Sequence, residues 1–262
     1  MKDVSVIIVN YNTLRITQDC IDSIVENTVG VSYEIIVVDN ASTDGSKDVL
    51  CKDRRIKYFY SERNGGFGYG NNVGMRNARG KYIFLLNSDT LLKNNAIKIF
   101  FDYSEENTPN TVYGCYLEGE DGSYRNSFFY FPAFSIGGFI RRIIHRPSYI
   151  PDYTNREVEC ICGADMFIPK SVVERVGNFD ENIFLYGEEG EWQYRMAMSG
   201  VKRMLINTPK IVHLEGKSIA DSPEKTALKL QSHFYVLRKY MNLPTYFMAW
   251  VYYYIWPRLK WW

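Results

Sequence analysis

The sequence carries almost no net charge: 31 Lys and Arg residues offset 30 Asp and Glu residues, which leaves +1. A nucleic-acid-binding surface is normally strongly basic, so we expect no nucleic-acid partner. Cysteine is also sparse, with five residues, an odd number without paired spacing. This usage fits a reducing cytosol better than a disulfide-stapled secreted scaffold. Cys160 and Cys162 form a CxC pair, but no second Cys or His cluster stands near it, which argues against zinc.

Long apolar runs are missing as well. The uncharged segment Met241–Pro257 is shorter than the ~20 residues that a membrane-spanning helix needs. Most of the Trp residues lie at this end, and aromatic rings beside Arg258 and Lys260 are typical of a bilayer interface. We therefore predict that residues 241–262 form an aromatic amphipathic tail that attaches to a membrane surface, the inner face of the cytoplasmic membrane. The alternative is a C-terminal helix that packs on the body or on another subunit.

The composition that is present is globular, with 46% hydrophobic and 23% charged residues. A chain of 262 residues can form one large domain or two small ones with a substantial core. The sequence begins directly with the strand-like "VSVIIVNYN" after Asp3, so we expect no signal peptide and a cytoplasmic location.

Strand-like and helix-like segments alternate through the first half of the chain. The helices are expected at Leu14–Glu26, Ser46–Lys52 and after a glycine-rich loop, and the strands at Ser5–Val9, Tyr33–Asp39, Ile56–Tyr60 and Lys81–Leu86. Continuous apolar strands separated by helices predict an α/β fold with a mostly parallel central sheet covered on both faces. From Asn107 to Glu157 no period is visible, and we interpret this stretch as an insertion or flap that forms one wall of a cleft.

Two predicted strands end on acidic residues. The apolar run Tyr82–Leu86 stops at Asn87, Ser88 and Asp89. Turns use these residue types, but ligands of open α/β sheets also gather at the carboxyl ends of strands. Asp39 ends another strand, where it could accept a hydrogen bond from a ribose hydroxyl or a base N–H, or could cap the next helix.

The glycine-rich segment Asn64–Asn72, "NGGFGYGNN", does not match a known dinucleotide motif. Its spacing is Gly66-x-Gly68-x-Gly70 instead of GxGxxG, and the expected downstream acidic residue is missing. The "GKS" at Gly216–Ser218 likewise lacks the upstream glycine of a Walker A loop. Glycines at a helix start still let backbone N–H groups approach a phosphate.

Three acids, Glu188, Glu189 and Glu191, follow the aromatic run "IFLY". The helix dipole favours acids at a helix start, and Glu191 can pair with the Arg four positions later. That explanation does not account for Glu188 and Glu189 directly behind a buried-looking aromatic run. A carboxyl among aromatic side chains has a raised pKa, which suits a general base. Of three histidines only His213, which closes the strand-like "KIV", is a candidate, although an isolated His is usually structural.

Read together, six segments in order resemble the family 2 glycosyltransferases of the GT-A fold, particularly the bacterial rhamnosyltransferase-like branch that builds surface polysaccharides. They are "SVIIVNYN", "IIVVDNASTDGS", "NGGFGYGNNVG", "LLNSDT", "CGADMFIPKSVVERVGNFDENIFLYGEE" and "HLEGKS". The resemblance covers about Val4–Ser218. It implies one GT-A domain over residues 1–240, with a nucleotide-sugar-binding half at 1–106, an acceptor and catalytic half at 107–240, and the tail.

The resemblance also implies roles for single residues. The implied nucleotide-sugar contacts are Val9, Asn10, Tyr11, Asp39, Asn64, Gly66, Asn87 and Ser88. Asp89 and His213 would bind Mg²⁺ or Mn²⁺ on the diphosphate, and Glu189 would be the general base. Two residues depart from the family pattern. Asn87 replaces the first Asp of the "DxD" motif, and Glu189 stands where Asp is usual, which leaves open whether Glu188 acts instead.

The implied reaction is inverting transfer of one sugar, rhamnose favoured, from a nucleotide diphosphate to a hydroxyl group. The donor would be dTDP-rhamnose or a UDP-sugar, and the acceptor a growing bacterial surface glycan or a lipid-linked glycan. A homo-oligomer stays open.

Two alternatives also remain. A sugar nucleotidyltransferase should show a Gly-rich, basic triphosphate loop after the first strand, where this chain has "NYNTLR". An inactive glycosyltransferase-like binding protein is disfavoured because Asp89, Glu189 and His213 are all present.

Overall fold

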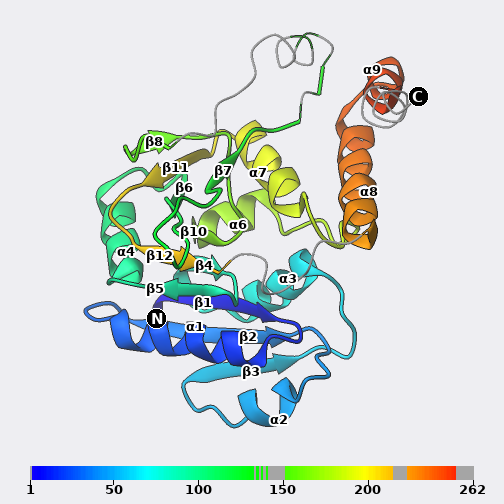
Figure 1. Ribbon diagram of the computed structural model, residues 1–262. Coiled ribbons are helices and arrows are strands. Elements are labelled where there is room, and N and C mark those ends of the chain that lie inside the picture. The colour runs from blue at the N-terminus through cyan, green and yellow to red at the C-terminus, as the bar shows by residue number, and fades with distance from the viewer. Residues whose placement is uncertain are drawn as a thin grey trace.

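The computed structural model describes residues 2–132, 134, 135, 137, 140, 151–214 and 223–251. A mixed eight-stranded sheet with helices on both faces runs through the molecule in the order β3-β2-β1-β4-β10-β6-β11-β8 (Figure 1). Its strands are β1 (Lys2–Asn10), β2 (Tyr33–Asp39), β3 (Ile56–Tyr60), β4 (Gly80–Leu86), β6 (Thr111–Cys115), β8 (Arg156–Glu157), β10 (Asp165–Pro169) and β11 (Lys202–Ile206). Two smaller sheets pair β12 (Ile211–His213) with β5 (Thr90–Leu92), and β7 (Phe128–Phe129) with β9 (Cys160–Ile161). The helices are α1 (Leu14–Asn27), α2 (Ser46–Leu50), α3 (Phe67–Asn77), α4 (Ala96–Glu106), α6 (Lys170–Val176), α7 (Glu188–Met198), α8 (Pro223–Tyr240) and α9 (Leu243–Trp250).

The four strands predicted in the first half are confirmed, and they pair in parallel. Their apolar runs are continuous because both faces are buried: α1 packs Ile21 and Ile24 on one face, while Met75 of α3 packs on the other. The register sets Asn10 opposite Asp39, so the carboxyl ends of β1 and β2 lie at one edge.

The interpretation of residues 107–157 as a flap is wrong where it includes β6. All five residues of β6 are buried, and the strand pairs antiparallel with β10 and parallel with β11 inside the main sheet. A five-residue strand buried on both faces has no alternation that would reveal it among aromatic neighbours. The sheet is also less parallel than expected, because β10 runs antiparallel to β4 as well. Residues 141–150 of the same stretch lie outside the described residues.

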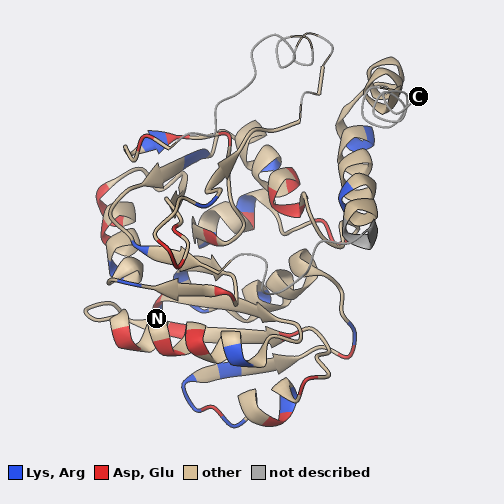
Figure 2. Ribbon diagram, in the orientation of Figure 1, with Lys and Arg blue, Asp and Glu red and all other residues tan. Residues whose placement is uncertain are grey.

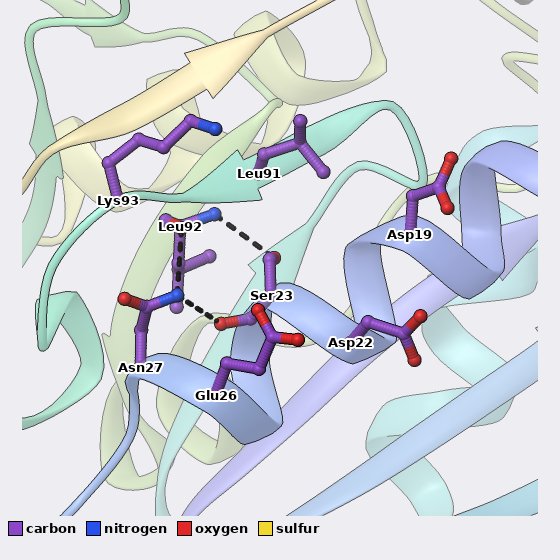
Figure 3. Close-up of a pocket in the computed structure, with 8 residues that line it drawn as sticks. All are labelled: Asp19, Asp22, Ser23, Glu26, Asn27, Leu91, Leu92 and Lys93. Carbon is purple, nitrogen blue, oxygen red and sulfur yellow. Dashed lines mark hydrogen bonds between the residues drawn. The ribbon is translucent and has the colours of Figure 1, made fainter.

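Helix α1 holds β5 in place, and with it the turn that follows β4. The backbone N–H of Leu92 donates to Ser23 Oγ at 3.1 Å, and the Asn27 amide donates to the carbonyl of Leu92 at 3.1 Å (Figure 3). A surface cavity of ≈ 260 Å³ lies beside this contact. It is lined by Asp19, Asp22, Ser23, Glu26, Asn27, Leu91, Leu92 and Lys93, and it includes none of the predicted site residues.

Two helices end the described chain. Buried Leu237 and Met241 pack against Ala249, which joins α8 to α9. Asn242 caps α9 by accepting a hydrogen bond from the N–H of Thr245 at 3.0 Å. No helix in the described ranges combines the length and the apolar character that crossing a bilayer requires. The remainder of the predicted tail, residues 252–262, is outside the described part of the chain, as is the "GKS" at Gly216–Ser218.

Candidate active site

The polar end of β4 is a turn that is closed by hydrogen bonds to the backbone of Asn87. The carbonyl of Asn87 accepts hydrogen bonds from the N–H and the hydroxyl of Thr90, at 3.3 and 2.8 Å. The N–H of Asn87 donates to the carbonyl of Ala164 at 3.0 Å. Asn87 Oδ1 is buried and has no hydrogen-bond partner among the described residues. The turn hypothesis is therefore correct for the backbone, and it leaves a side-chain oxygen available for a ligand.

Asp89 and His213, which are far apart in the sequence, meet at this turn. Strand β12 pairs antiparallel with β5 and sets His213 opposite Thr90, while the N–H of Leu214 donates to the carbonyl of Asp89 at 2.8 Å. His213 Nε2 lies 3.3 Å from Asp89 Oδ1, and both side chains are almost completely buried. The small β5–β12 sheet thus brings the two predicted metal ligands together.

These groups fit a divalent cation that is completed by a substrate. A carboxylate oxygen, an imidazole nitrogen and an unpaired amide oxygen are ligand types that Mn²⁺ accepts. Within the described ranges, no group of three or more His, Cys, Asp or Glu side chains could hold a metal alone. Mg²⁺ and similar ions are commonly held by one or two carboxylates plus substrate phosphates and water.

The acid pair begins α7 after a strained turn. Tyr186 and Gly187 have φ values of 67° and 99°, and α7 starts at Glu188. Burial raises the pKa of Glu188 well above its usual value, with the charge of Glu189 adding to the effect. Burial also raises the pKa of Glu189, against hydrogen bonds from backbone N–H groups such as that of Gly187, 3.2 Å away.

The two acids differ in access. Glu188 is 3% exposed, and in the described part of the chain its Oε2 has no partner. Glu189 is only partly buried. A group that takes a proton from a substrate has to reach it, so the exposure of Glu189 favours Glu189 over Glu188 as the base.

A short segment connects Glu189 to the turn after β4. A methyl group added at Gly163 would lie 3.5 Å from Cβ and Cγ of Glu189. The next residue, Ala164, supplies the carbonyl that accepts from the N–H of Asn87. Glu189 and the Asn87–Asp89 turn therefore lie next to the same short segment, Gly163–Ala164.

The residues expected to hold the base and ribose divide into buried and exposed ones. Asp39 is fully buried, and its carboxylate accepts from the N–H of Ser42 and the hydroxyl of Tyr58, both at 2.8 Å. Asn10 is also fully buried, and its amide donates to Ser42 Oγ at 2.9 Å. Both hold the loop at Ser42, and their direct contact with a ligand stays a prediction. Tyr11 is 46% exposed, and its contact with a ligand also stays a prediction.

The glycine-rich loop approaches the acid-bearing segment closely. Gly66 has φ of +89°, and a methyl group there would lie 1.9 Å from the carbonyl oxygen of Phe184. The N–H of Phe67 donates to that same carbonyl at 3.2 Å, and Asn64 Oδ1 accepts from the N–H of Gly66 at 3.0 Å. In α3, a methyl at Gly70 would lie 2.7 Å from the side chain of Val9. These glycines permit close packing of backbone, which the sequence motif alone did not reveal.

Sequence reasoning missed one buried acid beside the site. Asp165 begins β10, is fully buried, and accepts from the N–H of Cys115 at 2.7 Å. Its other oxygen is unpaired among the residues that the structure describes. Burial raises the pKa of Asp165 to about 7, although the backbone hydrogen bond and the nearby His213 lower it. An Asp at the start of an apolar strand was the available signal.

The family is decided by a model match that spans most of this architecture. The model of Glycosyl transferase family 2 matches residues 5–177, which include most of β1, all of β2 to β4, the Asn87–Asp89 turn and Asp165, while Glu188, Glu189 and His213 lie beyond the match. The chain belongs to glycosyl transferase family 2. The family predicted from the sequence is confirmed.

Relatives of this family 2 chain match about half of it. It is 32% identical over 131 residues to "Glycosyltransferase GlyG" of Streptococcus pneumoniae, covering 48% of this chain and 43% of GlyG. It is 29% identical over 135 residues to "Poly(ribitol-phosphate) beta-N-acetylglucosaminyltransferase TarP" of Staphylococcus aureus, covering 49% of this chain and 41% of TarP. The matched regions thus span less than half the length of these relatives.

A solved structure shares the fold of this family 2 chain at low sequence identity. The crystal structure of GalNAc-T7 with UDP, GalNAc and Mn²⁺ superimposes with a TM-score of 0.66 over 88% of this chain and 47% of that chain, at 15% identity. The predicted GT-A fold is confirmed.

Proposed function

We propose that this chain transfers one sugar, with inversion, from a nucleotide-diphosphate sugar to a hydroxyl group of a surface or lipid-linked glycan. The observation that carries the proposal is the 3.3 Å contact between Asp89 and His213. The turn that holds Asp89 is hydrogen-bonded to Ala164, and the neighbouring Gly163 lies against Glu189. The diphosphate of a donor bound at Asp89 and His213 and an acceptor hydroxyl at Glu189 would then lie close together at the carboxyl end of β4. TarP acts, by its name, on poly(ribitol-phosphate), which supports a surface glycan as acceptor.

The proposed chemistry needs few groups. Mg²⁺ or Mn²⁺, when bound by Asp89 and His213, would offset the charge that grows on the departing diphosphate, a role worth several kcal/mol. Glu189 takes the proton of the acceptor hydroxyl as its oxygen attacks the anomeric carbon from the opposite face. General-base help of this kind is worth about 10²–10⁴ in rate. Burial and the charge of Glu189 both raise the pKa of Glu188, so we propose that Glu188 is the protonated member of the pair.

The resemblance to the rhamnosyltransferase-like branch favours dTDP-rhamnose, and the UDP in the GalNAc-T7 structure supports including UDP-sugars. Asn87 Oδ1, Ser88, Asn64 and Gly66 are the groups proposed to meet the diphosphate and sugar.

The proposed domain is residues 1–240. The sheet supports one domain, because β4 of the first half pairs with β10 of the second.

We also propose that the tail attaches this domain to an anionic membrane surface on the cytoplasmic side. On α9, Leu243 is 73% exposed, Phe247 63% and Met248 46%. Residues 223–262 contain six basic residues against one acidic residue, and Figure 2 shows Lys and Arg along α8. Exposed apolar side chains next to basic groups suit the surface of an anionic bilayer.

The decisive assay is a panel of nucleotide sugars with Mg²⁺ or Mn²⁺, scored by release of nucleoside diphosphate. Wild type should turn over one donor, EDTA should stop the reaction, and Asp89→Ala should lose it. Asp48→Ala, at an exposed position of α2, is the matched control and should keep full activity. Release of pyrophosphate from a sugar phosphate and a nucleoside triphosphate would instead show a nucleotidyltransferase. Binding without turnover of any donor would show an inactive binding protein.

A further inference from the structure

One face of α8 lies along the segment that leads into the acid pair. Ser232 Oγ donates to the carbonyl of Leu185 at 2.7 Å, and the hydroxyl of Tyr235 donates to Asp180 Oδ2 at 3.0 Å. Lys239 Nζ donates to the same Asp180 oxygen at 2.6 Å. Residues 232, 235 and 239 are spaced by three and four, so they form one stripe on the helix.

Lys239 also reaches the first turn of α7, where Glu191 is 1% exposed. Lys239 Nζ and the hydroxyl of Tyr240 donate to Glu191 Oε1 at 2.9 and 2.6 Å, and Arg195 Nε lies 3.0 and 3.1 Å from the two carboxylate oxygens. Burial raises the pKa of Glu191, but the hydrogen bonds from Arg195, Tyr240 and Lys239 lower it by more, so its pKa lies below the usual value. Lys239 therefore bridges two carboxylates, one at each end of the 180–191 segment.

The opposite side of this segment contacts the nucleotide-side elements. The carbonyl of Phe184 accepts from the N–H of Phe67, directly against Gly66. The Asn72 amide donates to Glu181 Oε1 at 2.9 Å, and the Asn72 side chain exchanges two hydrogen bonds, each 3.0 Å long, with the backbone of Phe179, the residue before the segment. The segment is thus held between α3 and α8. A non-glycine residue with positive φ, such as Tyr186, persists only where its surroundings determine the backbone.

We propose that Lys239 is a positioning residue for the transfer reaction: by joining Asp180 to Glu191, it fixes the orientation of Glu188 and Glu189 toward the donor site. The inference rests on the proposed function and adds a residue outside the matched family region. Lys239 touches no reacting group in this account. It acts through the backbone that carries the acids, and a displacement near 1 Å at a reacting group can cost about 10²-fold in rate.

The test compares Lys239→Met, which keeps the length and loses the charge, with Lys239→Arg, which keeps the charge. Arg238→Met is the matched control, because Arg238 is the neighbouring cation but lies over Tyr246 of α9. We expect Lys239→Met to lower kcat by about tenfold or more while the Kd for nucleoside diphosphate changes less than about threefold. Lys239→Arg should restore most of kcat, and Arg238→Met should stay within about twofold of wild type. If Lys239→Met folds poorly, Tyr240→Phe is the second variant. It removes only the hydroxyl that donates to Glu191, and it should lower kcat by a smaller factor.

Hydrogen exchange separates this inference from the proposed function. In Lys239→Met, amides of residues 180–191 should exchange faster while those of β1 to β4 stay protected. Amide exchange can be measured even if wild type shows no transfer. In that case the proposed function fails, and the exchange of residues 180–191 still tests whether Lys239 holds this segment in place. An unchanged kcat with a normal melting temperature overturns the proposal. So does an equal loss of kcat and diphosphate affinity, or unchanged exchange at residues 180–191.

Discussion

Asp165 and Glu191 are both buried carboxyls, yet their surroundings move their pKa values in opposite directions. Burial raises the pKa of Asp165 to about 7, because the hydrogen bond from the N–H of Cys115 and the nearby His213 offset the effect of burial only in part. Glu191 is buried too, but donors from Arg195, Tyr240 and Lys239 lower its pKa. The opposite directions of the two pKa shifts therefore follow from the donors, two of them cationic at Glu191, that each fold position supplies.

Asp165 should make stability depend on pH. Its pKa is about 7 in the folded chain against a usual value of 3.8, so the folded form keeps a proton that the unfolded form releases. The resulting stabilisation is complete below pH 3.8 and is lost as pH rises through 7, up to about 4 kcal/mol. Asp165→Asn keeps an acceptor for the N–H of Cys115 and cannot ionise. The free energy of unfolding of the variant relative to wild type should therefore increase from pH 5 to pH 8. Urea unfolding in EDTA at both pH values measures this, with Asp48→Asn as control, and a constant difference would contradict it.

The acid pair makes a prediction about catalysis. Glu189→Gln should keep diphosphate binding and lose about 10²–10⁴ in transfer rate, because the amide cannot take a proton. Glu188→Gln should lose much less, because Glu188 is proposed to be protonated already. The wild-type rate should fall with decreasing pH at a point above pH 4.5, since burial raises the pKa of the base. Initial rates of diphosphate release test this, and a larger loss in Glu188→Gln would make Glu188 the base.

At the scale of elements, the sequence predicted best where local pattern and tertiary burial agree. Strands β1 to β4 are apolar throughout because helices cover both faces, and α1 was expected at Leu14–Glu26 against Leu14–Asn27 observed. β6 was missed because its burial comes from β10 and β11, which lie far away in the sequence. Contacts of that range leave no periodic signal in the strand itself.

In the candidate site, too, the residues in a local pattern were predicted and those defined by distant contacts were not. The polar turn at Asn87–Asp89 was visible from the residues, but the pairing of Asp89 with His213 depended on the family resemblance. Asp165 and Lys239 were not predicted, because their importance comes from partners in other strands and helices. Sequence order alone does not state which distant groups will meet.

Gly66 tests the contact between the glycine-rich loop and the acid-bearing segment. Gly66→Ala adds a methyl 1.9 Å from the carbonyl oxygen of Phe184, at a φ of +89°. Gly45→Ala has nearly the same backbone strain, with φ of +86°, but nothing lies within 4 Å of the added methyl. Strain of this kind costs about 1 kcal/mol, so both variants should lose that much, and Gly66→Ala should lose more and also weaken diphosphate binding. Thermal unfolding and calorimetric titration measure both effects, and equal behaviour of the two variants would show that the contact is unimportant.

At the scale of the whole molecule, the C-terminal end combines a net positive charge with exposed apolar side chains. The double variant Leu243→Glu and Phe247→Glu changes exposed positions of α9 and leaves buried Ala249 in place. It should reduce sedimentation with anionic vesicles at least tenfold, and high salt should weaken wild-type binding. Val29→Glu, a 69% exposed position before β2, is the control and should bind as wild type does. Vesicle binding that survives the double variant would assign α9 to packing alone.

The central claim is that Asp89 and His213 hold a metal diphosphate next to Glu189. A crystal grown with Mn²⁺ and a nucleoside diphosphate tests it most directly, through the anomalous signal of the metal. The account predicts one manganese peak within about 2.5 Å of an Asp89 carboxylate oxygen and His213 Nε2, with the diphosphate on its open side. A bound diphosphate whose manganese touches neither residue would contradict the account.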